Sequence, residues 1–209
     1  MNFKKLEITG FKSFSEKTNF LIENGLTGIV GPNGCGKSNI VESLRWCMGE
    51  NSAKSMRGSG MEDVIFSGTS NRPSKNISEV TLLLENQDKG GPSQYKDFDE
   101  ISIRRKIEKD KGSKYFINDK EVRARDVQTF FADLSTGAHS PSLISQGKIG
   151  QLVTAKPIER KSILEEAAGI SGIHARRQEA ETRLNAAENN LKRADELKKQ
   201  QQKQLDNLK

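Results

Sequence analysis

Cysteine and long apolar runs are scarce in this sequence, and both absences narrow the class of protein. The two cysteines, Cys35 and Cys47, are too few for a disulfide framework, so we expect a reducing, cytosolic compartment. No apolar run approaches the roughly 20 residues of a membrane span. Residues 1–5 lead into a strand pattern rather than a signal peptide. We therefore expect an intracellular protein that has no membrane partner.

Apolar residues are also few, at 33% of the 209 residues, whereas charged residues make up 30%. This balance is unusual for one compact fold, so part of the chain should be a polar element bathed in solvent. The 34 Lys and Arg residues exceed the 28 Asp and Glu residues by six, and the pI is near 9.3. The excess of positive charge permits a nucleic-acid partner but does not require one.

Residues 31–38, GPNGCGKS, match the phosphate-loop pattern G-x-x-x-x-G-K-[ST] at every fixed position. The apolar run 26–30 before them predicts a strand, and residues 39–48 after them have apolar side chains at helical spacing. Glycines let the backbone wrap closely around phosphate, and a helix N-terminus adds partial positive charge. We expect Lys37 to reach the β- and γ-phosphates and the Ser38 hydroxyl to hold Mg²⁺. The alternative is a glycine-rich turn with an accidental Lys-Ser pair.

Alternation of apolar and polar residues and turn residues predict the other elements. Strands are expected within residues 3–14 before a turn at Gly10, and at 18–21, 63–66, 77–84, 101–107 and 115–117. Helices are expected from Asp126, as N-cap, to Leu134 and from Pro157 to near Gly169. Loops are expected at 49–60, 86–97 and 135–142, with 143–152 irregular.

The C-terminal block has a heptad pattern, which is typical of a coiled coil. Its seam positions, four and three residues apart, are Ala180, Leu184, Ala187, Leu191, Ala194, Lys198, Gln201, Leu205 and Leu208. Such a seam needs a partner helix, and no second long heptad segment is present in the sequence. The alternative is a solvated single helix docked on the domain. We place the domain boundary between residues 1–170 and 171–209.

A second carboxylate motif, which a nucleotide-hydrolysing phosphate-loop domain normally needs, is missing. The nearest candidate, the apolar run 80–84, ends in Glu85 and Asn86 and lacks the required Asp. Residues 134–138, LSTGA, echo the Leu-Ser-Gly-Gly signature of ABC-type ATPases only faintly. We interpret the site as half complete.

Taken together, these features resemble the N-terminal head segment of a bacterial SMC (structural maintenance of chromosomes) protein. The matching stretches occur in family order at residues 10–14, 31–39, 52–58 with 61–66, 145–149 and 165–170. The resemblance implies an α/β fold: the N-terminal lobe of a P-loop ABC-type ATPase head, with a mixed sheet around the phosphate-loop helix. A C-terminal coiled-coil helix would follow this lobe.

The resemblance also implies a nucleotide site for ATP and Mg²⁺. Gln146 would be the glutamine that completes the Mg²⁺ shell with Ser38, and Arg57 would lie near the nucleotide. Without the resemblance, Gln146 reads as a surface-loop residue and Arg57 as a basic residue in a flexible loop. The implied ATP-binding residues are Lys12, Pro32, Asn33, Gly34, Cys35, Gly36, Lys37, Ser38, Asn39 and Gln146. We expect no catalytic residue in this chain itself.

The implied partners are the chain's own C-terminal head lobe, a second SMC head in a homodimer, and kleisin and accessory subunits. Double-stranded DNA, bound without sequence preference, would contact Lys120, Arg123 and Arg125, with residues 104–106 nearby in sequence. The alternative for these basic residues is an ordinary solvated surface.

The implied function is the ATP-binding half of an ATPase for chromosome condensation and segregation, in the cytoplasm and associated with the nucleoid. ATP-driven engagement of heads would organise DNA, and hydrolysis would require the C-terminal lobe. One rival is the head of a coiled-coil DNA-repair or recombination ATPase, which should recruit a nuclease rather than a kleisin. Another is a structural coiled-coil protein with a degenerate nucleotide site. An ABC transporter subunit fits poorly, because a long coiled coil does not suit docking to a membrane partner.

Overall fold

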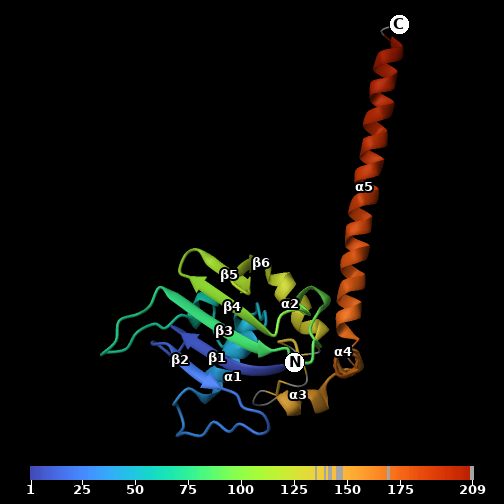
Figure 1. Ribbon diagram of the computed structural model, residues 1–209. Coiled ribbons are helices and arrows are strands. Elements are labelled where there is room, and N and C mark those ends of the chain that lie inside the picture. Colours follow the sequence, from blue (N-terminus) through green and yellow to red (C-terminus); the bar gives the residue numbers. More distant parts are fainter. Residues whose placement is uncertain (135, 139, 141–142, 145–147, 169, 208–209) are drawn as a thin grey trace. The chain divides into compact units, whose positions relative to one another are not determined.

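The computed structural model describes residues 1–134, 136–138, 140, 143–144, 148–168 and 170–207 (Figure 1). Its strands are β1 (Asn2–Thr9), β2 (Thr18–Leu21), β3 (Ile77–Glu85), β4 (Glu100–Glu108), β5 (Gly112–Ile117) and β6 (Lys120–Val122). Its α-helices are α1 (Lys37–Cys47), α2 (Ala124–Asp133), α3 (Lys148–Thr154), α4 (Pro157–Ala167) and α5 (Ser171–Asn207). Three short 3-10 helices are η1 (Lys54–Met56), η2 (Met61–Val64) and η3 (Ser93–Tyr95). The chain divides into two compact units, Met1–Ser171 and Gly172–Lys209.

The six strands form one sheet in the order β2-β1-β3-β4-β5-β6. The expected α/β fold is confirmed, and the predicted hairpin across residue 112 joins β4 to β5. One detail differs from the expected mixed sheet, because every pairing among these strands is antiparallel. The strand expected immediately before the phosphate loop does not join the sheet, so it brings in no parallel neighbour.

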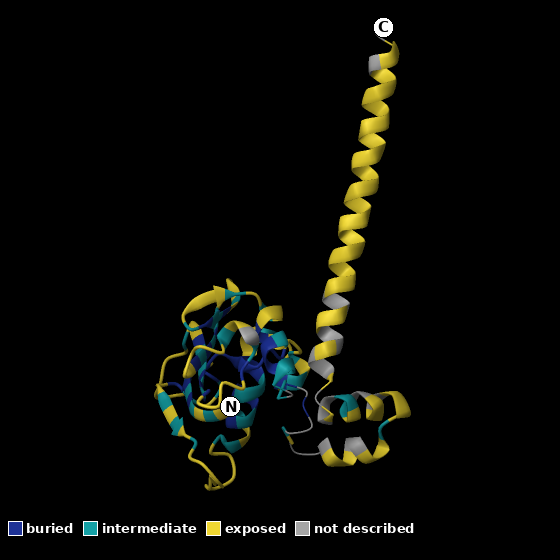
Figure 2. Ribbon diagram, turned by 45° about the vertical axis from the view of Figure 1, so that its right-hand side comes forward, coloured by how far each residue is buried: buried dark blue, intermediate teal, exposed yellow. Residues whose placement is uncertain are grey.

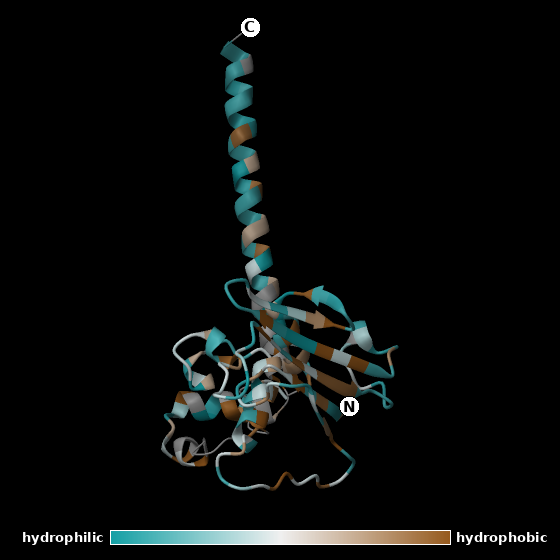
Figure 3. Cartoon of the chain, turned by 90° about the vertical axis from the view of Figure 1, so that its left-hand side faces the viewer, coloured by the Kyte–Doolittle hydropathy of each residue, from teal (hydrophilic) through white to brown (hydrophobic). Residues whose placement is uncertain are grey.

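One face of the sheet carries the core. Buried and more exposed residues alternate along β3 and β4. Figure 3 shows that the strands of the sheet carry both hydrophobic (brown) and hydrophilic (teal) segments. Helix α1 packs against β3 and β4, and α2 packs against β5. The most deeply buried apolar side chains are Leu6, Ile8, Phe11, Trp46, Cys47, Val64, Val80, Leu82, Ile101, Ile103, Val127 and Phe131. Each large aliphatic or aromatic side chain buried in this way contributes about 1.5–3 kcal/mol.

Arg105 interrupts this apolar face. It lies on β4 between Ile103 and Ile107 and is only 2% exposed, so Arg105, although near the predicted DNA-contacting residues in the sequence, is a core residue. Burial lowers the pKa of its guanidinium. The cation nevertheless stacks on the rings of Trp46 and Tyr115, with its Cζ 4.5 and 4.7 Å from the ring centroids.

The guanidinium of Arg105 also holds the C-terminal end of α1. Its Nη1 donates to the carbonyl oxygens of Trp46 at 2.8 Å and Glu50 at 2.6 Å. Gln128 of α2 donates to the carbonyl of Gly49 at 2.9 Å. The last carbonyls of a helix lack partners within the helix and carry partial negative charge, so a buried cation is favourable there. Residues from β4 and α2 therefore hold the end of α1 that lies away from the phosphate loop.

The apolar run 26–30 is not a strand, contrary to our prediction. These residues have no regular secondary structure, and Leu26 and Val30 are 101% and 94% exposed. An apolar run becomes a strand only where a neighbouring strand pairs with it. Among the described residues, the six strands pair with one another and none pairs with this run.

Three other boundaries differ from the predictions. Residues 63–66 are not a strand, because the Asp63 carboxylate accepts hydrogen bonds from Ser59 and Gly60 and closes the tight turn of η2. The N-cap of α2 is Arg123 rather than Asp126, whose carboxylate reaches back to accept from the Arg123 N–H at 2.9 Å. Residues 143–152 are not irregular throughout, because α3 begins at Lys148. The helix expected from Pro157 is confirmed as α4, while Gly169 lies outside the described residues.

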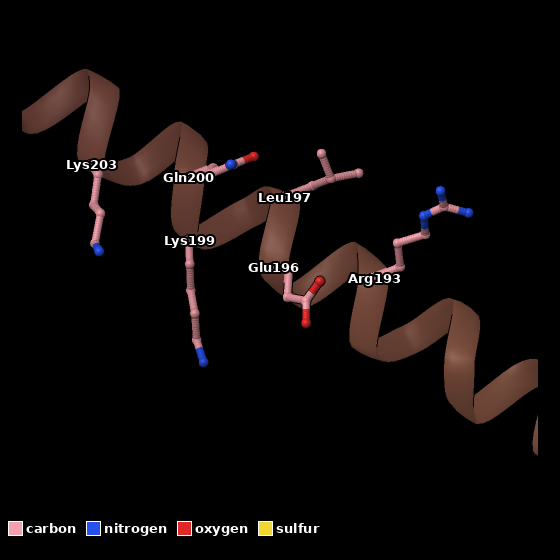
Figure 4. A pocket seen from close by; sticks show the side chains of 6 residues that line it. All are labelled: Arg193, Glu196, Leu197, Lys199, Gln200 and Lys203. Atoms are coloured by element: carbon pink, nitrogen blue, oxygen red, sulfur yellow. The ribbon is translucent and has the colours of Figure 1, made fainter.

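Helix α5 spans 37 residues, and every described side chain on it is exposed (Figure 2). Two seam leucines, Leu184 and Leu191, are among these exposed side chains. The side chains drawn in Figure 4 border a shallow hollow on this helix and are of mixed charge: Arg193, Glu196, Leu197, Lys199, Gln200 and Lys203. They project outward from one helix, which cannot enclose a ligand. Among the described helices, none combines the length and apolar character needed to cross a membrane.

Replacing Arg105 should destabilise the fold far more than replacing its neighbour Arg104. We expect Arg105→Ala to lower the free energy of unfolding by about 3 kcal/mol, because it leaves a cavity and removes the buried donor that the Trp46 and Glu50 carbonyls share. Arg104→Ala is the matched control, since Arg104 pairs with the exposed Asp119 at 2.9 Å and should cost less than about 1 kcal/mol. Urea unfolding of the 209-residue chain measures both values. Equal losses would contradict the role given to Arg105.

Candidate functional site

The phosphate loop folds around the ammonium group of its own lysine. Lys37 Nζ donates to the carbonyl oxygens of Gly31 and Pro32, both at 2.6 Å, and lies 3.8 Å from Cys35 Sγ. Ser38 follows in the exposed first turn of α1. A cation, a serine hydroxyl and the N–H groups of a helix N-terminus thus share one small region, and such a region favours a phosphate group.

Gly36 cannot be replaced in this loop without rearrangement. It is the N-cap of α1 with φ +94° in the left-handed region, where side chains are strained. A Cβ atom there would lie 2.5 Å from Ser13 Oγ. The backbone of the loop therefore approaches the segment that follows β1, and Asn39 Nδ2 donates to the same Ser13 oxygen at 2.9 Å.

Glu42 joins two of the predicted site residues. Its carboxylate pairs with Arg57 Nε at 2.5 Å and, through its other oxygen, with Lys12 Nζ. Arg57 Nη2 also donates to Asn39 Oδ1 at 3.0 Å, and Lys12 Nζ to the Met56 carbonyl. The structure thus brings Lys12, Asn39 and Arg57 together beside the phosphate loop, although they are far apart in the sequence.

A pocket of about 310 Å³ adjoins this cluster. Its lining residues are Ser38, Val41, Glu42, Arg45, Ser55, Arg57 and Ile144. The pocket therefore connects the metal-binding candidate Ser38 with the Glu42–Arg57 ion pair. A polyphosphate at the loop would meet positive charge from Lys37 and Arg57 there.

Sequence reasoning missed Glu42, whereas Ser13 lies in the stretch 10–14 on which the family resemblance rests. Glu42 lies four residues after Ser38 and so on the same face of α1, but a glutamate on a helix usually indicates a solvated surface. In the structure only 11% of its side chain is exposed. The spacing was the one available signal, because the partners Lys12 and Arg57 come from distant loops.

The residues predicted to contact DNA are not part of this cluster. Gln146 lies outside the described residues. Lys120 is on β6, and Arg123 and Arg125 are at the start of α2, where all three are exposed. Asn86, next to the rejected carboxylate candidate, is buried and uses its side chain to hold the loop before β4.

Residues 2–149 match the family described as the RecF/RecN/SMC N terminal domain. The chain belongs to this family. The chromosome partition protein Smc of Rhodopseudomonas palustris is 55% identical over 209 residues, and that of Cereibacter sphaeroides is 57% identical over 197. These alignments cover 100% and 94% of this chain but only 18% and 17% of the relatives, so the chain spans under a fifth of their length.

Solved structures agree with the family assignment. A structure reported under "Structural biochemistry of ATP-driven dimerization and DNA stimulated activation of SMC ATPases" has 33% identity and a TM-score of 0.68, covering 80% of this chain and 99% of that one. The Smc head of Pyrococcus furiosus, bound to the C-terminal domain of ScpA, has 34% identity and a TM-score of 0.74, covering 93% of this chain and 48% of that one. The Pyrococcus yayanosii head with its coiled coil has 36% identity and a TM-score of 0.71, covering 99% and 40%.

The two cysteines should differ sharply in reactivity, which gives a test of the loop. Cys47 is buried, and burial raises the pKa of its thiol to about 12, so it stays protonated and shielded at neutral pH. Cys35 is exposed in the phosphate loop. We expect Ellman's reagent to modify one thiol per native chain, and Cys35→Ser to abolish that reaction. Pyrophosphate should slow it, and rapid modification of both thiols in the folded chain would contradict the structure.

Proposed function

We propose that this chain is the ATP-binding half of an SMC-type ATPase head that organises chromosomal DNA. The observation that carries the proposal is the phosphate loop folded around Lys37, with Arg57 and Lys12 held beside it through Glu42. The names of the curated relatives favour chromosome partition. The family description also includes RecF and RecN, so a head of a DNA-repair ATPase remains the second candidate.

In the proposed site, the N–H groups of residues 32–38 and the ammonium of Lys37 bind the phosphates of ATP. Arg57 adds a second cation from the pocket side. Ser38 would hold Mg²⁺, and Gln146 would complete the ligand shell of the ion. The ion, when bound, would neutralise phosphate charge. In the described part of the chain, no group of three His, Cys, Asp or Glu side chains could hold a metal ion. This is consistent with a metal whose remaining ligands are phosphate oxygens and water.

The proposed partners supply what the half-site lacks. The exposed apolar run 26–30 leads directly into the phosphate loop, and pairing with a strand of a C-terminal head lobe would bury it. That lobe and a second head would bring the signature motif and the catalytic carboxylate. A kleisin is a further proposed partner, because a Smc head resembling this chain was solved bound to ScpA. A cytoplasmic, nucleoid-associated location follows from the same proposal.

ATP hydrolysis should depend on adding the missing lobe. We expect the 209-residue chain to bind ATP but to turn it over negligibly, since it offers no catalytic glutamate. Mixing with the separately expressed C-terminal head lobe of the Rhodopseudomonas palustris relative should produce activity, measured as phosphate release. Lys37→Ala should abolish that activity by removing the phosphate-binding cation. Robust turnover by the pure chain would contradict the half-site.

DNA binding should depend on the basic residues at β6 and the start of α2. We expect the triple change Lys120→Ala, Arg123→Ala and Arg125→Ala to weaken binding to a short duplex. It should also reduce the slope of log K against log salt by about 3, since each lost phosphate contact removes about 0.9. The matched control replaces three lysines that pair with carboxylates elsewhere, Lys4, Lys17 and Lys75. Fluorescence anisotropy measures both, and equal losses would show that only net charge matters.

A further inference from the structure

The carboxylate of Glu42 is too enclosed to be a surface charge and too close to the phosphate loop to be only a core contact. Its side chain is 11% exposed, whereas that of Arg57 is 59% exposed. A long exposed arginine loses substantial side-chain freedom when it is fixed in one position. Here Glu42, the nearly buried partner on α1, holds the Arg57 side chain in one position. The entropy cost of ordering Arg57 therefore falls on folding and not on ligand binding.

Contacts of the Arg57 guanidinium leave donors available. The group has five N–H donors. One on Nη2 donates to Asn39, and Nε forms the ion pair with Glu42. In the described part of the chain, no contact engages Nη1. Arg57 lines the same pocket as Ser38, so its guanidinium lies beside the space that a phosphate at the loop would enter.

Lys12 anchors the other side of the carboxylate. Its ammonium pairs with Glu42 and donates to the Met56 carbonyl, immediately before Arg57 in the chain. Arg57 has φ +56°, a left-handed conformation that is uncommon for a residue with a side chain. The contact of Lys12 with the Met56 carbonyl thus stabilises the turn that precedes Arg57. Glu42 then pairs with the side chain of Arg57.

We propose that Glu42 is a positioning residue for ATP binding: with Lys12 it holds the Arg57 guanidinium at the phosphate loop, ready to donate to a phosphate. This inference rests on the proposed function and adds a residue that neither the motif nor the resemblance assigns. Glu42 does not contact the nucleotide in this scheme. It acts through Arg57, so its effect depends on the presence of Arg57.

The test is a double-mutant cycle on ATP binding by the 209-residue chain. Glu42→Gln keeps the shape of the side chain and removes its charge. We expect it to raise the Kd for ATP roughly tenfold, but only about twofold when Arg57→Gln is already present, because coupled residues are non-additive. Glu42→Asp, which restores the charge, should recover part of the affinity. Glu16→Gln, at an exposed glutamate that pairs with Lys75, is the matched charge control and should leave the Kd unchanged.

Each result separates the possible roles of Glu42. Tighter ATP binding by Glu42→Gln would mean that the carboxylate only repels phosphate, and this would overturn the proposal. So would an equal loss in both backgrounds, which is expected of general damage to the fold, and thermal unfolding of each variant checks for that damage. If Glu42→Gln does not fold, Glu42→Asp in both backgrounds gives the same cycle, with a smaller effect expected.

The test also separates the role of Glu42 from the proposed function. Wild type that binds ATP no better than Lys37→Ala would refute the proposed function itself. Strong wild-type binding without coupling between Glu42 and Arg57 would refute only the role of Glu42.

Discussion

The contact between the Arg105 guanidinium and the carbonyls of Trp46 and Glu50, at and just beyond the C-terminal end of α1, helps to fix the helix that carries the phosphate loop. Burying an unpaired cation costs several kcal/mol, and here carbonyl oxygens and two aromatic rings replace the lost hydration. Helix α1 has 11 residues, so at 1.5 Å per residue its two ends are about 16 Å apart. Because the helix is rigid, holding the end that contacts Arg105 also limits where the end that joins the phosphate loop can lie. A charge inside the core therefore contributes to the geometry of a site that it does not touch.

The N-terminal end of α1 is held by the segment that follows β1. Phe11 is fully buried and packs on Trp46 with ring centroids 5.5 Å apart, and Arg105 also packs on the Trp46 ring. Two residues later, Ser13 meets Gly36 and Asn39 at the start of α1. Residues 10–14 thus contact both the Trp46 ring, through Phe11, and the first residues of α1, through Ser13. Glycine at position 36 is required because any side chain would separate the loop from this segment.

Sequence alone predicted the parts whose signals are local. The turn of residues 31–36 into α1, the alternating strands β3 to β5 and the start of α4 at Pro157 depend on short spacings, and the structure confirms these elements. The failures depend on contacts between distant residues. Arg105 reads as a surface charge because its stabilising carbonyls and rings come from α1 and β5. Glu42 reads as solvated because its cations come from two other loops, and the role of Gln146 stays a prediction.

The failed strand at 26–30 has a consequence for the proposed head. A run that is apolar, β-branched in part and exposed has the composition of an interior strand but no neighbour within the described chain. Its last residue, Val30, is bonded directly to Gly31 of the phosphate loop. When a neighbouring strand pairs with the run, the ordering of its backbone also restricts the first residues of the loop, whose carbonyls contact Lys37. Part of the entropy cost of fixing the loop is then met by lobe pairing rather than by ATP. In the proposed head, completing the sheet and strengthening the grip on phosphate are therefore one coupled equilibrium.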